Sequence, residues 1–455
     1  MRGLFVPRES AAIRASAALT GRRHGIDGLR AVCCLAIILF HSWDFAGRPR
    51  AYGLGLIGAL DVRNELFMAI SGFCLFLPLA TRPERLAAFS AREFLMARFR
   101  RIAPAYYAAI ALSLVLPFVA LGLLRATGAG PGWVSFPAQV DLLTQFRYSF
   151  PSAPDLLAHL FFVHTFFDSY WDGISGNLWF MGLEAQFYVV FPLVVLAYRR
   201  YGDRTLAAVL GLALAYSVAV SALVPDASER AFRMSALGGG IMFAVGIWAA
   251  VSLPRLRPGM SRRREGALLA GVLATVGSAV SWADRAPLGL PLRSVLLAAG
   301  FWGLVSLAAT PATRTARLLS IRPLTRLGLI SYSVYLVHHV TLFFVWQAGW
   351  QLGLARQGLS PLALELTVGV AVVLAVAYPF HLAFERPFLS RRSASTSSSG
   401  SGSAAPESPG SAGELRPAVA PAAAASPATA VIPAPRRGGT VGLRQGTGQS
   451  ARSGT

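Results

Sequence analysis

Long apolar stretches separated by short polar connections run through most of the chain, from residue 30 to residue 384. Each stretch approaches the roughly 20 apolar residues that a helix needs to cross the hydrocarbon core of a bilayer. A single segment crosses the bilayer as a helix, because in a helix the backbone N–H and C=O groups form their hydrogen bonds within the segment itself. We therefore predict an all-α fold, a polytopic bundle of about ten membrane helices at residues 30–46, 62–80, 103–124, 176–197, 204–224, 233–252, 265–283, 291–310, 326–349 and 361–384.

The connections and the two ends divide the chain into three parts. We predict a basic cytoplasmic N-terminal segment at 1–23, a membrane domain at 24–392 and a cytoplasmic tail at 393–455, whose Ser-, Ala-, Pro- and Gly-rich composition is typical of disorder. The N-terminal segment has no uninterrupted apolar stretch, so we expect no cleavable signal peptide. Within the connection 125–175, the apolar run that starts at His159 is too short to cross, and we expect a re-entrant or interfacial segment.

Composition excludes a soluble multidomain protein of this length. Of the 455 residues, 54% are hydrophobic and only 14% are charged. The net charge of +21 does not indicate a nucleic-acid partner, because most of the 42 basic residues, all of them Arg, lie in short connections. With the N-terminus in the cytoplasm, the outer connections hold seven Arg, whereas 26 Arg lie in the inner segments 2–23, 81–101, 198–204, 253–264, 311–326 and 386–392. This asymmetry predicts an N-in, C-in topology.

The three cysteines, Cys33, Cys34 and Cys74, all lie within apolar segments. Adjacent cysteines cannot form an ordinary disulfide, and the sequence contains no Cys-x-x-Cys motif or Cys/His cluster. We therefore expect neither a disulfide framework nor a structural metal site.

Ionisable residues at membrane depth are costly, so each one is a candidate for function. Arg30 and His41 lie eleven residues apart, or about three helical turns, and share one face of the first helix about 16 Å apart along its axis. Arg30 falls at the cytoplasmic edge, and His41 about two-thirds of the way to the outer surface. The alternative for His41 is a buried polar residue with a structural role.

Counting from the predicted helix ends places three further groups near the depth of His41. Glu65, Glu184 and His338 all fall in the outer half of the bundle, the last two about 12 Å below the outer boundary. A histidine beside carboxylates is a general-base arrangement, because the carboxylate orients one ring nitrogen while the other accepts a proton. The alternatives are that Glu184 bonds a neighbouring helix, that Glu65 pairs with Arg63, and that His338 is structural.

The connection 81–101 ends in two arginines, Arg98 and Arg101, which are one turn apart at the start of the third helix. Two guanidiniums in this position form a clamp for phosphates that arrive from the cytoplasm. The alternative is the general excess of Arg in inner connections, which explains the other arginines of this segment.

Six sequence motifs occur in the order in which one known family has them. They are Arg30-x10-His41, Glu65-Leu-Phe-Met-Ala-Ile-Ser-Gly-Phe73, Arg98-x-x-Arg101, Trp179-x-x-x-x-Glu184 with Tyr188 and Pro192, Ser331 to His338, and Phe384-Glu385-x-Pro387. Over about residues 24–392 the chain resembles the acyltransferase-3 family of integral-membrane acyltransferases. It departs from the family pattern at Glu65 and Met68, where Asp and Phe are commoner, and neither change removes a needed chemical group.

The resemblance implies transfer of an acyl group, most commonly acetyl, from acyl-CoA to a hydroxyl of an envelope saccharide, a glycolipid or a natural product, in the bacterial plasma (inner) membrane. Its partners would be the lipid bilayer, the donor and the acceptor, with no metal and no nucleic acid. The resemblance implies catalytic roles for His41, Arg30, Glu184 and Glu65, donor binding by Arg98 and Arg101, and substrate binding by Trp179, Tyr188 and His338.

Two functions of other classes fit the same pattern. A proton-coupled multi-pass transporter or exporter also places His, Glu and Arg at membrane depth, although the sequence shows no repeated halves. A non-catalytic membrane scaffold or sensor would use the Arg-rich connections and tail, but it leaves the buried polar residues unexplained. Consumption of acyl-CoA with release of a free thiol separates the enzyme from both.

Overall fold

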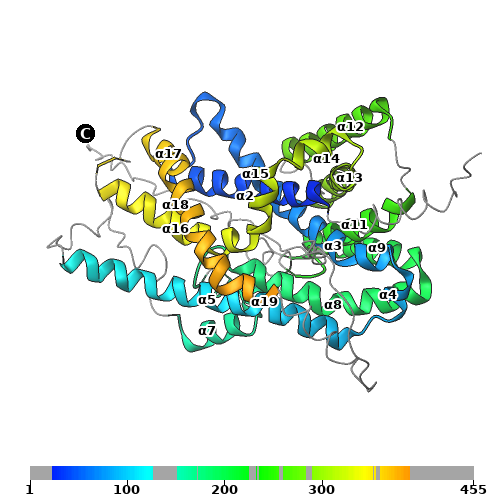
Figure 1. Ribbon diagram of the computed structural model, residues 1–455, viewed down its shortest axis with the longest axis horizontal. Coiled ribbons are helices and arrows are strands. Elements are labelled where there is room, and N and C mark those ends of the chain that lie inside the picture. The colour runs from blue at the N-terminus through cyan, green and yellow to red at the C-terminus, as the bar shows by residue number, and fades with distance from the viewer. Residues whose placement is uncertain are drawn as a thin grey trace, which may run out of the picture.

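The computed structural model describes residues 23–126, 151–171, 173–224, 232, 235–255, 260–282, 289–351, 353–354 and 359–389. These residues are mostly helical and no strand occurs among them, which confirms the predicted all-α class (Figure 1). The predictions for residues 1–22 and for the tail from residue 393 lie outside the described residues, as do those for 127–150.

Ten helices form the body of the described structure. They are α2 (His24–Phe45), α3 (Arg63–Ala80), α5 (Ala91–Ala126), α8 (Trp179–Tyr201), α9 (Asp203–Leu223), α11 (Gly240–Ser252), α12 (Arg262–Trp282), α13 (Gly289–Ala309), α16 (Ser331–Gln351) and α18 (Val370–Phe380). Shorter helices connect or extend them: η1 (Ala51–Val62), α4 (Pro83–Ala87), α7 (Ala153–Leu160), η3 (His164–Phe166), η4 (Leu253–Arg255), α14 (Arg314–Leu319), α15 (Arg322–Leu329), α17 (Ser360–Leu364), η5 (Glu365–Gly369), η6 (His381–Glu385) and α19 (Arg386–Leu389).

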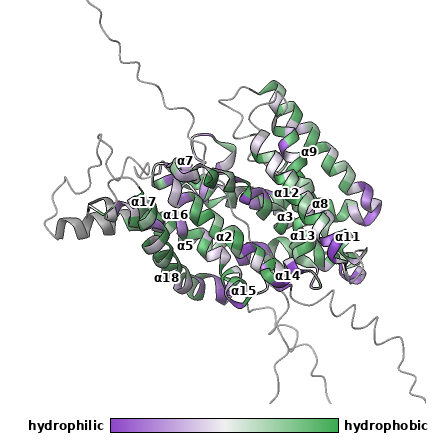
Figure 2. Cartoon of the chain, turned by 90° about the horizontal axis from the view of Figure 1, so that it is seen from above, coloured by the Kyte–Doolittle hydropathy of each residue, from purple (hydrophilic) through white to green (hydrophobic). Residues whose placement is uncertain are grey.

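Seven segments of the described chain are long and apolar enough to cross a membrane, so the protein is an integral membrane protein. They are His24–Phe45, Ala51–Ala80, Ala91–Leu116, Trp179–Tyr201, Asp203–Leu223, Leu290–Ala309 and Ser360–Leu389. An eighth results if Arg322–Leu329 and Ser331–Gly349, which meet at a bend of 76°, are one span. Hydrophobic residues predominate along most of the helices (Figure 2).

The predicted count of about ten spans is not confirmed. The span expected at 233–252 corresponds to α11, which has only 13 residues. The span expected at 265–283 corresponds to α12, whose first turn carries three arginines and a glutamate. The N-in, C-in topology stays a prediction, because helix positions alone do not give the side of the membrane on which each connection lies.

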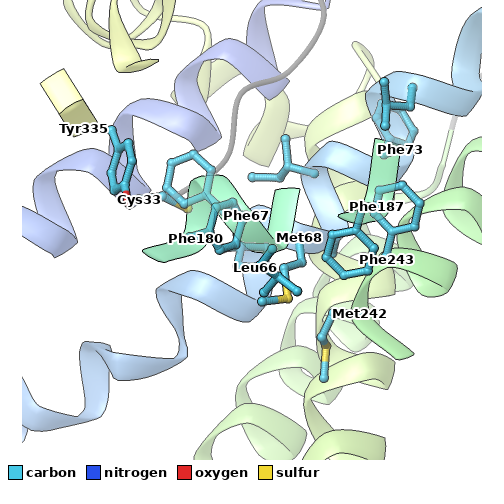
Figure 3. Close-up of a cluster of buried hydrophobic side chains, with 14 of the residues drawn as sticks. Cys33, Leu66, Phe67, Met68, Phe73, Phe180, Phe187, Met242, Phe243 and Tyr335 are labelled. Carbon is cyan, nitrogen blue, oxygen red and sulfur yellow. The ribbon is translucent and has the colours of Figure 1, made fainter. Parts of the chain in front are cut away.

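One apolar core joins α2, α3, α8, α11 and α16 (Figure 3). Phe187 of α8 and Phe243 of α11 stack with ring centroids 4.5 Å apart and planes 9° apart. Cys33, Phe67 and Phe180 are fully buried in the same cluster. This core fixes the relative positions of the helices that carry most of the candidate site residues.

Reciprocal glycines bring α3 and α11 into backbone contact. A Cβ added to Gly72 of α3 would lie 2.1 Å from a carbonyl oxygen of α11, and a Cβ added to Gly246 of α11 would lie 1.9 Å from the carbonyl oxygen of Ala69. Close approaches also occur at Gly28 of α2, which faces the carbonyl of Leu319 of α14, and at Gly328 of α15, which faces the carbonyl of Asp27 of α2. Small residues allow membrane helices to pack this closely, because no side chain stands between the backbones.

Helix α7 and the residues directly after it lie against α5 (Figure 1). Tyr106 and Tyr107 of α5 donate hydrogen bonds to the carbonyl oxygens of His159 and Leu160, at 3.0 and 2.9 Å. Phe162 stacks on Tyr106 with ring centroids 4.5 Å apart. At eight residues α7 is too short to span. The apolar run that starts at His159 continues from α7 into η3, and its re-entrant or interfacial placement stays a prediction.

Candidate active site

Three histidines, His41 of α2 and His338 and His339 of α16, meet in what we call the histidine group. The ring centroid of His41 lies 5.2 Å from that of His338 and 5.1 Å from that of His339. His41 and His338 are 1% and 0% exposed. The rings of Phe40 and Phe45 lie 5.5 and 6.4 Å from the His41 ring. The structure therefore brings two predicted site residues together in an apolar surrounding.

One hydrogen bond determines which nitrogen of neutral His338 carries the proton. Its Nδ1 lies 2.6 Å from the carbonyl oxygen of Tyr335. Because a carbonyl oxygen only accepts, the proton is on Nδ1 and the lone pair of the neutral ring is on Nε2. This Nε2 and the Nδ1 of His41 are both buried and make no hydrogen bond within the described structure. An imidazole lone pair of this kind can accept a proton from a hydroxyl.

The segment just before α8 positions this part of α16. Asn177 donates hydrogen bonds from Nδ2 to the carbonyl oxygens of Tyr335, at 2.8 Å, and Leu336, at 3.3 Å. Ser175 Oγ donates to Asn177 Oδ1 at 2.7 Å. The Tyr335 carbonyl thus accepts from Asn177 and His338 together. Asn177 is not among the site residues predicted from the sequence, although a Ser-Gly-Asn run at the start of a predicted span is a signal for it.

Arg30 and His41 are both buried on α2, at 2% and 1% exposed, so neither faces lipid. Arg30 Nη1 lies 4.0 Å from Asp27 Oδ1, and the charge of Arg30 acts on Glu184 and Arg101. The two predicted partners therefore share a buried helix, but Arg30 belongs to a second polar group.

This second group, the arginine group, comprises Arg30, Arg98, Arg101, Glu184 and Tyr188. Glu184 Oε1 accepts a hydrogen bond of 2.5 Å from Tyr188 Oη. The Arg98 guanidinium lies 5.7 Å from the centroid of the Tyr188 ring, and the charges of Arg101, Arg98 and Arg30 act on Glu184. Three cations therefore act on one buried carboxylate, and the carboxylates of Asp27 and Glu385 approach the same group at Arg30 and Arg101.

Neither predicted carboxylate contacts His41. Glu184 lies in the arginine group, and Glu65 accepts a hydrogen bond from Arg293 of α13 instead of pairing with Arg63. The expectation that a carboxylate orients His41 is therefore not supported. The physical reason is that depth along a helix fixes only one coordinate, whereas the rotation of each helix decides which neighbour its side chain meets.

Trp179 and Glu385 complete the set of motif residues. Trp179 is fully buried and packs edge to face on Trp171, with ring centroids 5.6 Å apart; its predicted substrate role stays a prediction. Glu385 of η6 accepts a hydrogen bond of 2.6 Å from Ser333 Oγ, and its charge acts on Arg101. Glu385, for which the sequence predicts a packing or interfacial role, therefore links α16 to the arginine group.

A third polar cluster holds the segment between α7 and α8. The rings of His159 and His164 stack with centroids 3.9 Å apart and planes 7° apart. His159 Nδ1 lies 3.0 Å from Asp155 Oδ1, and His164 Nε2 lies 3.2 Å from the carbonyl oxygen of Leu178. Burial, and then the neighbouring His159, hold the pKa of His164 well below its usual value of 6.5.

We expect stability to fall at acid pH through His164. Its pKa is lower in the folded than in the unfolded chain, so the unfolded chain binds more protons below pH 6.5. The stabilising contribution of neutral His164 is present above that pH and decreases as pH falls. Thermal unfolding of the detergent-solubilised protein should show a Tm that decreases by a few degrees between about pH 7 and pH 5.

His164→Gln keeps a donor for the Leu178 carbonyl and should make this part of the pH dependence smaller. His24→Gln, at an exposed position, is the matched control and should leave the wild-type profile unchanged. An identical decrease of Tm in wild type and His164→Gln would assign the pH dependence to other groups.

A helical membrane bundle with a buried histidine group and a separate arginine group fits the class of integral-membrane acyltransferases. Comparison with family profiles establishes this: the profile described as an acyltransferase domain matches residues 23–382, so the chain belongs to the acyltransferase-3 family. The predicted resemblance is confirmed. Family membership favours the acyltransferase over the exporter and scaffold alternatives.

Two curated relatives show the same similarity. The peptidoglycan O-acetyltransferase OatA of Listeria monocytogenes is 26% identical over 339 residues, which is 69% of this chain and 48% of that protein. The O-acetyltransferase OatA of Staphylococcus aureus is 25% identical over 354 residues, or 70% of this chain and 51% of that protein. The chain thus spans about half the length of the curated relatives it matches. No solved structure gives a significant match.

Proposed function

We propose that the protein is a membrane O-acyltransferase that moves an acyl group, with acetyl as the leading candidate, from acyl-CoA to a hydroxyl of an envelope saccharide, glycolipid or natural product. The observation that carries the proposal is the contact between buried His41 and His338, centroids 5.2 Å apart, within a chain of the acyltransferase-3 family. The OatA relatives, named as O-acetyltransferases, support acetyl as the group transferred. The bacterial plasma membrane is the proposed location.

In the proposed reaction, His41 removes the proton of the acceptor hydroxyl while the oxygen attacks the thioester carbonyl. The tetrahedral intermediate collapses, the carbon–sulfur bond breaks, and the sulfur takes the proton from the imidazolium, so the products are an ester and free CoA. His338, held by the Tyr335 carbonyl, faces His41 and is placed to bind or share the same hydroxyl. We assign Glu184 and Arg30 to binding of the acyl-CoA donor and not to orientation of the base His41, because both lie in the arginine group.

Donor binding is assigned to the arginine group. CoA carries phosphates, and guanidiniums bind phosphates through paired, charge-assisted hydrogen bonds. With the proposed N-in topology, Arg98 and Arg101 lie at the cytoplasmic end of α5, where acyl-CoA is available. The thioester then extends along the buried face of α2 that leads from Arg30 to His41.

The direct test is acyl-CoA consumption by the purified full chain in lipid nanodiscs. Release of free thiol from acetyl-CoA, with the acetyl group recovered as an ester on a sugar hydroxyl, is the expected result. Absence of thiol release with acetyl-CoA and with longer acyl-CoAs, across saccharide and lipid acceptors, would reject the proposed function.

We expect Arg98→Gln to weaken donor binding selectively. Loss of one charge-assisted contact to phosphate should raise the KM for acetyl-CoA about tenfold or more. The KM for the acetyl thioester of N-acetylcysteamine, which has no phosphate, should change little. Arg100→Gln, an exposed arginine on the same helix, is the matched control. Equal changes for both donors would mean that Arg98 supports the fold and does not bind phosphate.

A further inference from the structure

Arg63 is a buried cation next to the histidine group. It is the first residue of α3 and is only 3% exposed. Its guanidinium lies 4.0 Å from the centroid of the Phe40 ring, and the same ring contacts His41 edge to face. The charge of Arg63 acts on both His41 and His338. A guanidinium stacked on an aromatic face is held in a fixed plane, so its free edge has a defined direction.

Only one end of this guanidinium is used by the protein. Nη1 donates to the carbonyl oxygen of Leu60 at 2.9 Å and lies 3.6 Å from Asp61 Oδ1. Nε and Nη2 are buried and make no hydrogen bond within the described part of the chain. These two nitrogens share one edge of the guanidinium, the edge whose parallel N–H groups match two oxygens of a carboxylate or phosphate. Buried donors of a charged group are normally paired, so this edge indicates a ligand.

The charges of Glu65 and Asp44 act on Arg63, but each of these two carboxylates is paired with another arginine. Glu65 pairs with Arg293, and Arg48 pairs with Asp44 at 2.6 Å. Asp61, the nearest acid to Arg63, approaches the opposite end of the guanidinium, and its side chain is 31% exposed. Within the described residues the Nε–Nη2 edge has no hydrogen-bond partner, and Arg63 contacts the same Phe40 ring as His41, the proposed general base.

We propose that the Nε–Nη2 edge of Arg63 binds a carboxylate or phosphate group carried by the acceptor, and so makes the enzyme select acidic acceptors. This inference rests on the proposed function, in which the acceptor hydroxyl is deprotonated at His41. Donor phosphates are assigned to the arginine group, which leaves Arg63 for the other substrate. Two parallel donors match an anion with two terminal oxygens better than the single oxygen of a tetrahedral intermediate.

The test compares three sugars that differ in charge. N-acetylmuramic acid carries a carboxylate, N-acetylglucosamine 1-phosphate carries a phosphate, and N-acetylglucosamine carries neither. With the full chain in nanodiscs and acetyl-CoA as donor, at least one charged sugar should have a KM about tenfold or more below that of the neutral sugar. The charged sugar that binds identifies the anion as carboxylate or phosphate.

Variants locate this preference on Arg63. Arg63→Gln should raise the KM for the charged sugar to that for the neutral one, and leave the KM for the neutral sugar unchanged. Arg63→Lys, which keeps the charge and loses the paired donors, should give an intermediate KM. Arg48→Gln, an ion-paired arginine on the same side, is the control and should preserve the preference. A loss of kcat that is equal for charged and neutral sugars would overturn the proposal in favour of a role in the intermediate or the fold.

A binding measurement separates this inference from the proposed reaction. The charged sugar should raise the Tm of wild type and of His41→Ala without acyl-CoA, and this increase should be absent in Arg63→Gln. If no thiol is released but the Arg63-dependent increase is observed, the reaction fails and the anion site stands. If thiol is released but wild type and Arg63→Gln bind all three sugars alike, the anion site fails and the reaction stands.

Discussion

Replacement of His41 by alanine is expected to abolish acyl transfer, with a decrease in kcat of about a hundred- to ten-thousandfold. The physical reason is that a neutral hydroxyl is a poor nucleophile, and His41 is the imidazole that α2 carries into the histidine group. Thiol release from acetyl-CoA in the presence of an acceptor measures the effect.

Two further variants separate the chemistry of His41 from its packing. His41→Gln keeps a polar side chain of similar size but has no basic nitrogen, and it should be as inactive as His41→Ala. Phe45→Leu disturbs the aromatic packing around His41 and His339 but leaves the imidazoles intact, and it should retain most of the activity. An active and folded His41→Gln enzyme would require another group, with His338 as the first candidate, to act as the base.

Gly246→Ala is expected to have the largest effect on stability. The added Cβ would lie 1.9 Å from the carbonyl oxygen of Ala69, which is backbone and cannot rotate away. Helices α3 and α11 would have to separate, and overpacking of this kind typically costs about 1–3 kcal/mol or more. Thermal unfolding in detergent should show a lower Tm, and the yield of folded protein should decrease.

Gly271→Ala on α12 is the matched control, since a Cβ there meets no atom within 4 Å. It should leave Tm unchanged or raise it slightly, because alanine favours a helix over glycine. Equal Tm values for Gly246→Ala and Gly271→Ala would show that α3 and α11 tolerate separation, and that the close approach does not stabilise the bundle.

Separation of α3 and α11 should also change acceptor binding at the candidate active site. Gly246 contacts α3 near Ala69, and α3 begins with Arg63 and carries Glu65. A Gly246→Ala enzyme that folds at low temperature should therefore show a higher KM for the acceptor, while the donor KM, set by the arginine group on α5 and α8, should change less.

Seven of the ten spans predicted from apolar runs correspond to helices long and apolar enough to cross a membrane, and α2 begins six residues before the predicted start of its span. The segment predicted at 326–349 is broken, because α15 and α16 meet at a bend of 76°. The segment predicted at 361–384 contains two π-helical turns, η5 and η6. Hydropathy averages over a window and does not register such breaks, which depend on backbone hydrogen bonding.

The sequence by itself determined that the chain forms apolar helices, because the bilayer requires about 20 apolar residues with internal hydrogen bonds. It also determined that His41 and His338 lie at similar depth, because each residue advances a helix by a fixed rise. Only the tertiary structure decided that these two imidazoles touch, that Glu65 pairs with Arg293, and that Arg63 is buried with two guanidinium nitrogens that make no hydrogen bond in the described part of the chain. Those contacts depend on how helices that are far apart in the chain are rotated and cross one another. Side-chain packing and backbone contact at glycines fix these angles only when the bundle assembles.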